Sequence, residues 1–165
     1  DPNYETSTDY RNDDILLINK YPGSEGQNRL NDLKIFRASE MYFIVAEAQI
    51  NAGNLEDAAE TLQTVRDIRY APNNAPSQPT YANATQAWAD VLAERRIELA
   101  FEGHRWVDLG RLGSKAQVQV DRDERDCEVV SVCEIPIDDY RYTLPIPATE
   151  IGNNDAISGQ QNPGY

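Results

Sequence analysis

The chain has 165 residues, of which 40% are hydrophobic and 26% are charged, and its formal net charge is −13. This composition is that of a globular protein rather than a disordered one, and no stretch approaches the ~18 consecutive apolar residues of a membrane-spanning helix. The negative charge argues against nucleic acid as a partner, because nucleic-acid binding needs clustered lysine and arginine.

The first elements expected along the chain are a short strand and a loop. The stretch "DILLINKYP" (14–22) is rich in β-forming residues and ends at Pro-Gly, and "GSEGQNRLND" (23–32) is polar and glycine-rich. Residues 14–34 are therefore predicted to form a strand and a loop.

Residues 35–71 have the pattern of an antiparallel helical hairpin. Gly53 ends the first helix, and Asn54 is suited to cap the second. Small or apolar residues at helical spacing are expected to form the packed face of the first helix: Ala38, Met41, Tyr42, Val45, Ala46 and Gln49. The stripe expected on the second helix consists of Leu55, Ala58, Ala59, Leu62 and Val65.

A long helix is predicted over residues 84–113, with Thr85 as its cap and an interruption of the pattern at Gly103. Its packed side is expected to consist of Trp88, Val91, Leu92, Arg95 and Leu99. After Gly113 the period becomes two, and "QVQV", "EVVSV" and "YRYTL" are typical of short strands. The fold class is therefore mainly α, a helical hairpin plus a further helix, with a small β-rich C-terminal extension and tail over residues 114–165.

Cys127 and Cys133 leave two interpretations open. A disulfide is the expected pairing in an exported protein. However, "CEVVSVC" as one continuous strand would place the two residues roughly 20 Å apart, at ~3.3 Å per residue, and a disulfide needs Cα atoms within about 7 Å. Either the chain turns near Ser131 and the bond forms, or both thiols stay free.

The stretch "ERRIELAFEGHRWVDLGRLG" (94–113) carries eight formal charges and the chain's single histidine. Glu94, Glu98 and Glu102 share a helix face, as catalytic carboxylates could. Neighbouring arginines hold carboxylates ionised, which is wrong for a general acid. The stretch is instead predicted to be a structural charge network made of Glu94, Arg95, Arg96, Glu98, Glu102, His104, Arg105, Asp108 and Arg111. On this interpretation Arg105→Ala destabilises the fold without removing a ligand contact.

No catalytic or metal site is predicted. A Ser-His-Asp triad would have to use His104, and the sequence has no Gly-x-Ser-x-Gly elbow. The tripeptide "EGH" (102–104) lacks zinc-ligand spacing, so His104 is expected to be a hydrogen-bonded structural residue. The run "DRDERD" (121–126) lacks the glycine and closing glutamate of a calcium loop and is expected to be a solvated turn. The protein is predicted to be no enzyme and to use no cofactor.

Four motifs, taken in order, resemble one family. They are "LKIFRASEMYFIVAEAQINAGNLEDAAETLQTVR", "ERRIELAFEGHRWVDLGRLG", "YTLPIPATEI" and the terminal "QNPGY". Together they resemble the C-terminal half of the SusD/RagB family over roughly residues 14–165. The helical hairpin is also similar to one tetratricopeptide repeat. The residues that carry this second likeness are Tyr42, Val45, Ala46, Gly53, Ala58 and Leu62.

The resemblance implies a mostly helical, non-enzymatic lipoprotein on the outer face of the Gram-negative outer membrane. Members of the family bind glycans or other nutrients and cap a TonB-dependent transporter as its lid. This chain is shorter than the family, so the N-terminal half with the lipid anchor is expected to be a separate part of the same protein and a partner of this one. The expected organisation is a single SusD/RagB-like C-terminal region over residues 1–165.

The resemblance assigns no ligand-binding residue, because the family's site is built largely from loop aromatics outside these motifs. From the residues alone, tyrosines in polar loops are the candidates, since they combine apolar area with a polar handle. These tyrosines are Tyr4, Tyr10, Tyr21 and Tyr81, whereas Trp88 is assigned to the core. The alternative function is a protein-interaction module of tetratricopeptide type without a small ligand of its own.

Overall fold

The computed structural model describes residues 20–21, 23–24, 26–27, 30–32, 34–127 and 132–165. The chain divides into two compact units, Asp1–Ile35 and Phe36–Tyr165, and each is described by itself. Among the described residues of the first unit, Ser24 and Gln27 form an isolated antiparallel bridge. Most of the strand expected over residues 14–22 lies outside the described residues.

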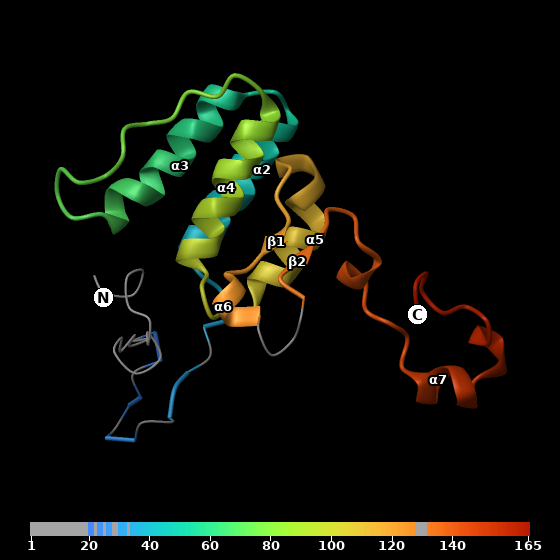
Figure 1. The fold of residues 1–165 in the computed structure, drawn as a ribbon. Coiled ribbons are helices and arrows are strands. Elements are labelled where there is room, and N and C mark those ends of the chain that lie inside the picture. The colour runs from blue at the N-terminus through green and yellow to red at the C-terminus, as the bar shows by residue number, and fades with distance from the viewer. Residues whose placement is uncertain (1–19, 22, 25, 28–29, 33, 128–131) are drawn as a thin grey trace. The chain divides into compact units, whose positions relative to one another are not determined.

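The second unit begins with the predicted helical hairpin, which is confirmed. Helix α2 spans Ala38–Asn51, helix α3 spans Leu55–Arg69, and the two pack against each other (Figure 1). Gly53 makes the turn between them with a φ of 83°, which glycine adopts without steric cost. The stripe expected on α3 is also confirmed, with buried positions at Ala58, Ala59, Leu62 and Val65.

Helix α2 packs with a different face from the one predicted. Its buried residues are Ser39, Phe43, Ala46 and Ile50. Of the residues expected to be covered, Met41, Tyr42 and Val45 are 47%, 42% and 48% exposed. The prediction failed because α2 is apolar on almost every side, so the period of the pattern does not decide which side meets the core.

The long helix predicted over residues 84–113 is divided into two helices, and the division includes Gly103, where an interruption of the pattern was expected. Helix α4 spans Ala84–Glu98 and helix α5 spans His104–Ala116, and they pack against each other. Between them, Phe101 and Gly103 have positive φ angles of 63° and 82°. A right-handed helix cannot continue through such backbone, so the chain turns and α5 folds back onto α4.

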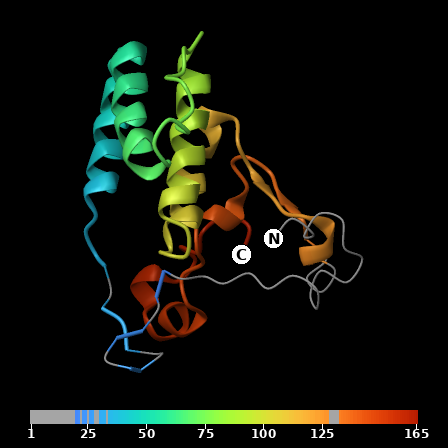
Figure 2. The same cartoon turned by 90° about the vertical axis from the view of Figure 1, so that its left-hand side faces the viewer.

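Helix α4 is the centre of the core, since it packs on α2, α3 and α5 (Figures 1 and 2). Its predicted face is buried throughout: Trp88, Val91, Leu92, Arg95 and Leu99. The helix begins after Asn83 rather than at Thr85. Asn83 Oδ1 accepts from the backbone N–H of Gln86, while Gln86 Oε1 accepts from that of Ala82. This reciprocal pair satisfies two amides that a helix start leaves unbonded.

The described residues of the C-terminal extension hold less β structure than predicted, and most of the strand expected at "EVVSV" (128–132) lies outside them. Strands β1 (Val120–Asp121) and β2 (Glu134–Ile135) form one antiparallel pair. The stretch "YRYTL" begins as the 3-10 turn η1 (Tyr140–Tyr142) instead of a strand, because Asp139 caps it by accepting from the N–H of Arg141. The remaining elements are α6 (Glu124–Cys127), α7 (Ala148–Asn153) and η2 (Asp155–Ile157). The mainly helical fold class is confirmed, and its β part is minor.

The terminal motif "QNPGY" docks on the motif "LPIP". Gln161 binds the backbone of Ile146 twice, accepting from its N–H at 2.8 Å and donating to its carbonyl at 3.0 Å. Asn162 Nδ2 donates to the carbonyl of Leu144 at 2.6 Å. Prolines flank Ile146 and have no N–H to donate, so the side-chain amides of the tail supply the partners that this extended segment lacks.

Cys127 and Cys133 are joined by a disulfide. Their Cα atoms lie 5.4 Å apart, within the range that the bond allows. The turn expected near Ser131 lies outside the described residues. On either side of it, α6 ends at Cys127 and the Cys133 carbonyl accepts from the N–H of Arg122 beside β1.

Removal of this disulfide should lower the stability of the chain. In the chain-entropy account, closing a loop this short contributes about 2 kcal/mol to the free energy of unfolding. We expect the double variant Cys127→Ser, Cys133→Ser to unfold at a correspondingly lower urea concentration, and dithiothreitol to have the same effect on the unaltered chain. An unchanged midpoint in both experiments would contradict this role.

Candidate functional site

A buried ion pair joins α3 to α4. Glu94 is 5% exposed and accepts from Arg66 Nε at 2.7 Å, while Arg66 Nη2 donates to Asp90 at 2.7 Å. Burial by itself would lower the pKa of Arg66, but hydrogen bonds to Asp90 and Glu94 hold that pKa well above its ordinary value. Arg66 therefore keeps its charge, and the pair stays ionised.

The other two glutamates, Glu98 and Glu102, are paired as well, although Glu102 lies in the turn after α4 and not on the shared helix face that was predicted. Glu98 accepts from Arg69 of α3 at 2.9 and 2.6 Å and also binds Arg37, which precedes α2. Glu102 accepts from Arg37 Nη1 at 2.6 Å, and the same nitrogen donates to the Glu98 carbonyl at 2.7 Å. Both carboxylates therefore accept hydrogen bonds from guanidinium groups of other elements.

A second charged group joins α2, α4 and α5. Arg95 is 3% exposed, and its Nε donates to Asp108 at 2.8 Å. A second carboxylate, that of Glu47, lies 3.6 Å from Arg95 Nη1. Arg111 donates to Asp108 at 3.0 and 2.8 Å and to Glu47 at 2.5 and 2.8 Å. Hydrogen bonds to Glu47 raise the pKa of Arg111 above its ordinary value, against the effect of burial. Charged side chains thus tie α5 to both neighbouring helices.

Arg96 and Arg105 lie outside this network, so the prediction is wrong for these two residues. Arg96 is exposed and Arg105 is half-buried, and no described residue forms an ion pair with either side chain. The nearest suitable acid on the same helix is Asp108, whose two oxygens already accept from Arg95 and Arg111. Arg105→Ala is therefore no longer expected to destabilise the fold.

His104 is positioned by a contact weaker than the hydrogen bond that was expected. Its Nδ1 lies 3.7 Å from Glu40 Oε1, which is beyond hydrogen-bond distance. Among the described residues, no group of three or more histidine, cysteine, aspartate or glutamate side chains is arranged to hold a metal ion.

Sequence reasoning missed the partners that lie outside the stretch 94–113. These partners are Arg37, Glu40, Glu47, Arg66, Arg69 and Asp90. A signal existed for Arg66, which follows Leu62 by four residues and so continues the apolar stripe of α3. A charged residue on a buried stripe requires a buried partner. The same reasoning correctly put Arg95 on the packed side of its helix.

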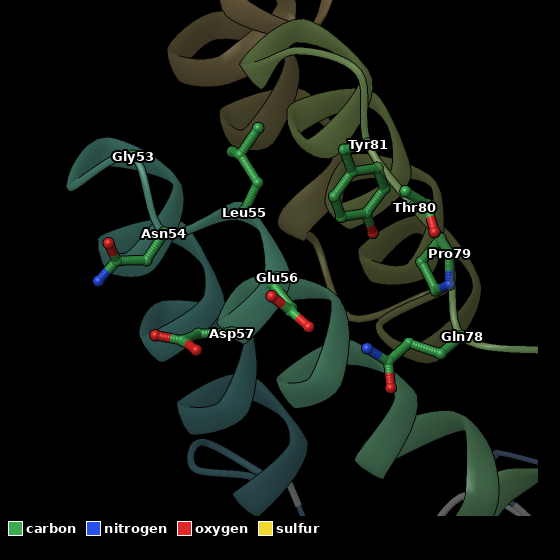
Figure 3. Close-up of a pocket in the computed structure, with 9 residues that line it drawn as sticks. All are labelled: Gly53, Asn54, Leu55, Glu56, Asp57, Gln78, Pro79, Thr80 and Tyr81. Atoms are coloured by element: carbon green, nitrogen blue, oxygen red, sulfur yellow. The ribbon is translucent and has the colours of Figure 1, made fainter.

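A polar pocket of about 710 Å³ lies between the start of α3 and the loop that precedes α4 (Figure 3). Its lining residues are Gly53, Asn54, Leu55, Glu56, Asp57, Gln78, Pro79, Thr80 and Tyr81. Figure 3 shows Gln78 extending from the loop toward Glu56 on the helix. Asn54, Asp57 and Gln78 are exposed, so the pocket presents amide and carboxylate groups that can bind hydroxyl groups.

Tyr81 is the one tyrosine of the four candidates that lines this pocket. Its ring is half-buried against the core, and its hydroxyl donates to Asp90 at 2.7 Å. Burial and this hydrogen bond raise the pKa of Tyr81 far above its ordinary value, so the phenol stays neutral.

Tyr21 lies in the first unit, and Tyr4 and Tyr10 lie outside the described residues. Trp88 is 5% exposed and belongs to the core, as predicted.

Arg95 and Arg96 are adjacent arginines in opposite environments, and they make a matched pair of variants. Arg95→Ala should lower the free energy of unfolding by about 3 kcal/mol or more, because it leaves Asp108 buried with less positive charge. Arg96→Ala removes the same charge from an exposed side chain and should change that energy by less than about 0.5 kcal/mol. Equal losses in urea unfolding would refute the assignment.

The comparisons with known proteins agree with one another. The model of the SusD family matches residues 1–165. The SusD-like protein P38 of Formosa agariphila is 32% identical over 109 residues, which are 62% of this chain and 22% of that protein. The crystal structure of a SusD superfamily protein from Bacteroides thetaiotaomicron has a TM-score of 0.66 at 30% identity, and the match covers 87% of this chain and 30% of that one. The chain spans less than a third of the length of both relatives. It belongs to the SusD family.

Proposed function

We propose that this chain is part of a lipid-anchored SusD-like protein that binds glycans or other nutrients at the Gram-negative outer membrane and caps a TonB-dependent transporter. The observation that carries the proposal is the family match over residues 1–165. None of the described helices is long and apolar enough to cross a membrane. In this proposal the lipid anchor and further ligand contacts belong to the full-length protein.

The polar pocket at the start of α3 is the proposed ligand-binding surface of this region. Sugar hydroxyls both donate and accept hydrogen bonds, and the amides of Asn54 and Gln78 can meet both needs. The ring of Tyr81 adds a flat apolar wall whose hydroxyl is already fixed by Asp90. The carboxylates of Glu56 and Asp57 favour a neutral ligand over an acidic one.

The proposed activity is binding without catalysis. Glycoside hydrolysis needs one carboxylic acid with a raised pKa beside a second, ionised carboxylate. The conspicuous glutamates Glu94, Glu98 and Glu102 are instead paired with arginines, so each of these carboxylates already accepts hydrogen bonds within the chain.

A second candidate function is protein interaction through the hairpin. The observation that favours it is the exposed apolar side of α2, where Met41, Ile44 and Val45 are 47%, 50% and 48% exposed. Such a face suits a partner helix. Co-purification with a transporter and no glycan binding would favour this function over the first.

Glycan binding should depend on the polar groups of the pocket. We expect a neutral oligosaccharide from a glycan panel to bind the 165-residue chain, and Asp57→Ala and Gln78→Ala each to weaken that binding about fivefold to tenfold through a lost hydrogen bond. The matched control is Gln160→Ala, an exposed amide in the C-terminal tail. Calorimetry measures each affinity. Equal binding by all three variants would remove the pocket from the proposal, and a panel without any bound glycan would count against the function.

A further inference from the structure

Arg96 and Arg105 lie side by side on the border of three adjoining hollows, away from the pocket at the start of α3. Hollows of about 660, 280 and 400 Å³ all have both arginines in their linings. Two positive side chains at one place repel each other unless an anion lies between them. The chain carries a net charge of −13, yet no described residue supplies that anion.

Arg105 is the less favourably placed of the two. Its Nη1 is buried, and no described residue accepts a hydrogen bond from it. Burial lowers the pKa of Arg105, and the charge of Arg96 lowers it further, although Asp108 opposes both. A buried donor without an acceptor costs free energy, so this side chain is arranged for a partner that the described residues do not contain.

The largest of the three hollows has a mostly apolar wall. Trp106 and Leu109 come from α5, and Val120 and Ile135 face each other across the β1–β2 pair. Tyr142 fixes this wall, since its hydroxyl accepts from the N–H of Val120 and donates to the carbonyl of Ile135.

Other charges border the same hollow without neutralising the two arginines. Arg141 also lines it but is paired with Asp139 at 2.7 Å. Asp121 is a carboxylate in the lining, and it forms no ion pair with Arg96 or Arg105 in the described part of the chain. Arg122 adds a further positive side chain to the lining. Among the described residues, the hollow therefore combines an apolar body with a positive end that no ion pair neutralises at Arg96 or Arg105.

We propose that this hollow is a second binding site, which takes a small organic carboxylate whose apolar body lies against Trp106 and Ile135 and whose carboxylate binds Arg96 and Arg105. Arginine binds carboxylates through two parallel hydrogen bonds, which suits a planar anion. A monoanion also costs less to transfer into apolar surroundings than a phosphate dianion does. The site is independent of glycan binding and differs from the polar pocket in both charge and lining.

Benzoate, benzyl alcohol and inorganic phosphate separate the parts of this proposal in the 165-residue chain. Benzoate carries both the ring and the carboxylate, benzyl alcohol lacks the charge, and phosphate lacks the apolar body. We expect benzoate to bind saturably and to shift the side-chain nitrogen NMR signals of Arg96 and Arg105. We expect benzyl alcohol and phosphate to bind at least about tenfold more weakly, in keeping with the loss of a charge-assisted hydrogen bond or of the apolar contact.

Two variants and one control locate the bound anion. Arg105→Gln and Arg96→Gln should each weaken benzoate binding about tenfold or more, while Lys115→Gln removes one exposed positive charge that lines none of the three hollows and should leave it unchanged. Circular dichroism establishes that each variant is folded, and the NMR shifts of the unaltered chain test the site without any variant. The proposal is overturned by benzoate that leaves both arginine signals in place, by benzyl alcohol that binds equally well, or by phosphate that binds as tightly.

Discussion

The fold depends on the requirement that a buried charge be paired. Helix α4 meets three other helices at once, yet its packed side carries Glu94 and Arg95, which are 5% and 3% exposed. Either charge, left alone, would cost several kcal/mol. Arg66 of α3 and Asp108 of α5 supply the partners at 2.7 and 2.8 Å, so a shift of either helix by one turn would separate a buried charge from its nearest partner. Ion pairs thereby select one arrangement among the many that apolar packing alone would allow.

Glu94 and Arg95, two conspicuous charges of the stretch 94–113, are ion-paired to neighbouring helices. The arginines that pair with the glutamates of α4 donate hydrogen bonds to both of these carboxylates. The C-terminal motifs follow the same logic with neutral groups, because Gln161 binds both backbone groups of Ile146. What remains open to ligands is a polar hollow at the start of α3 and an apolar hollow at the two arginines that the network does not include.

Sequence reasoning reached the hairpin and the packed faces of α3 and α4. Sequence reasoning failed where the hydrophobic pattern fits more than one buried face of a helix. It also failed where tertiary contacts decide which residues are buried or paired. Helix α2 is apolar on most sides, so its buried face follows from what α3 and α4 cover. The break between α4 and α5 rests on positive φ angles at Phe101 and Gly103, of which only the glycine was a visible signal. Paired residues of the charge network lie up to 65 residues apart in sequence. The polar pocket is lined by the start of α3 and by the loop before α4, two segments that no single sequence motif connects.

The central claim is that paired buried charges hold α5 to α4, and a double-mutant cycle at Arg95 and Asp108 tests it most directly. The variants are Arg95→Met, Asp108→Leu and the two combined, each measured by urea unfolding. Each single variant leaves one buried charge without its main partner, whereas the double variant leaves neither of this pair. We predict that the double variant loses less free energy of unfolding than the sum of the single losses, by about 2 kcal/mol or more. Losses that add within about 0.5 kcal/mol would contradict the account.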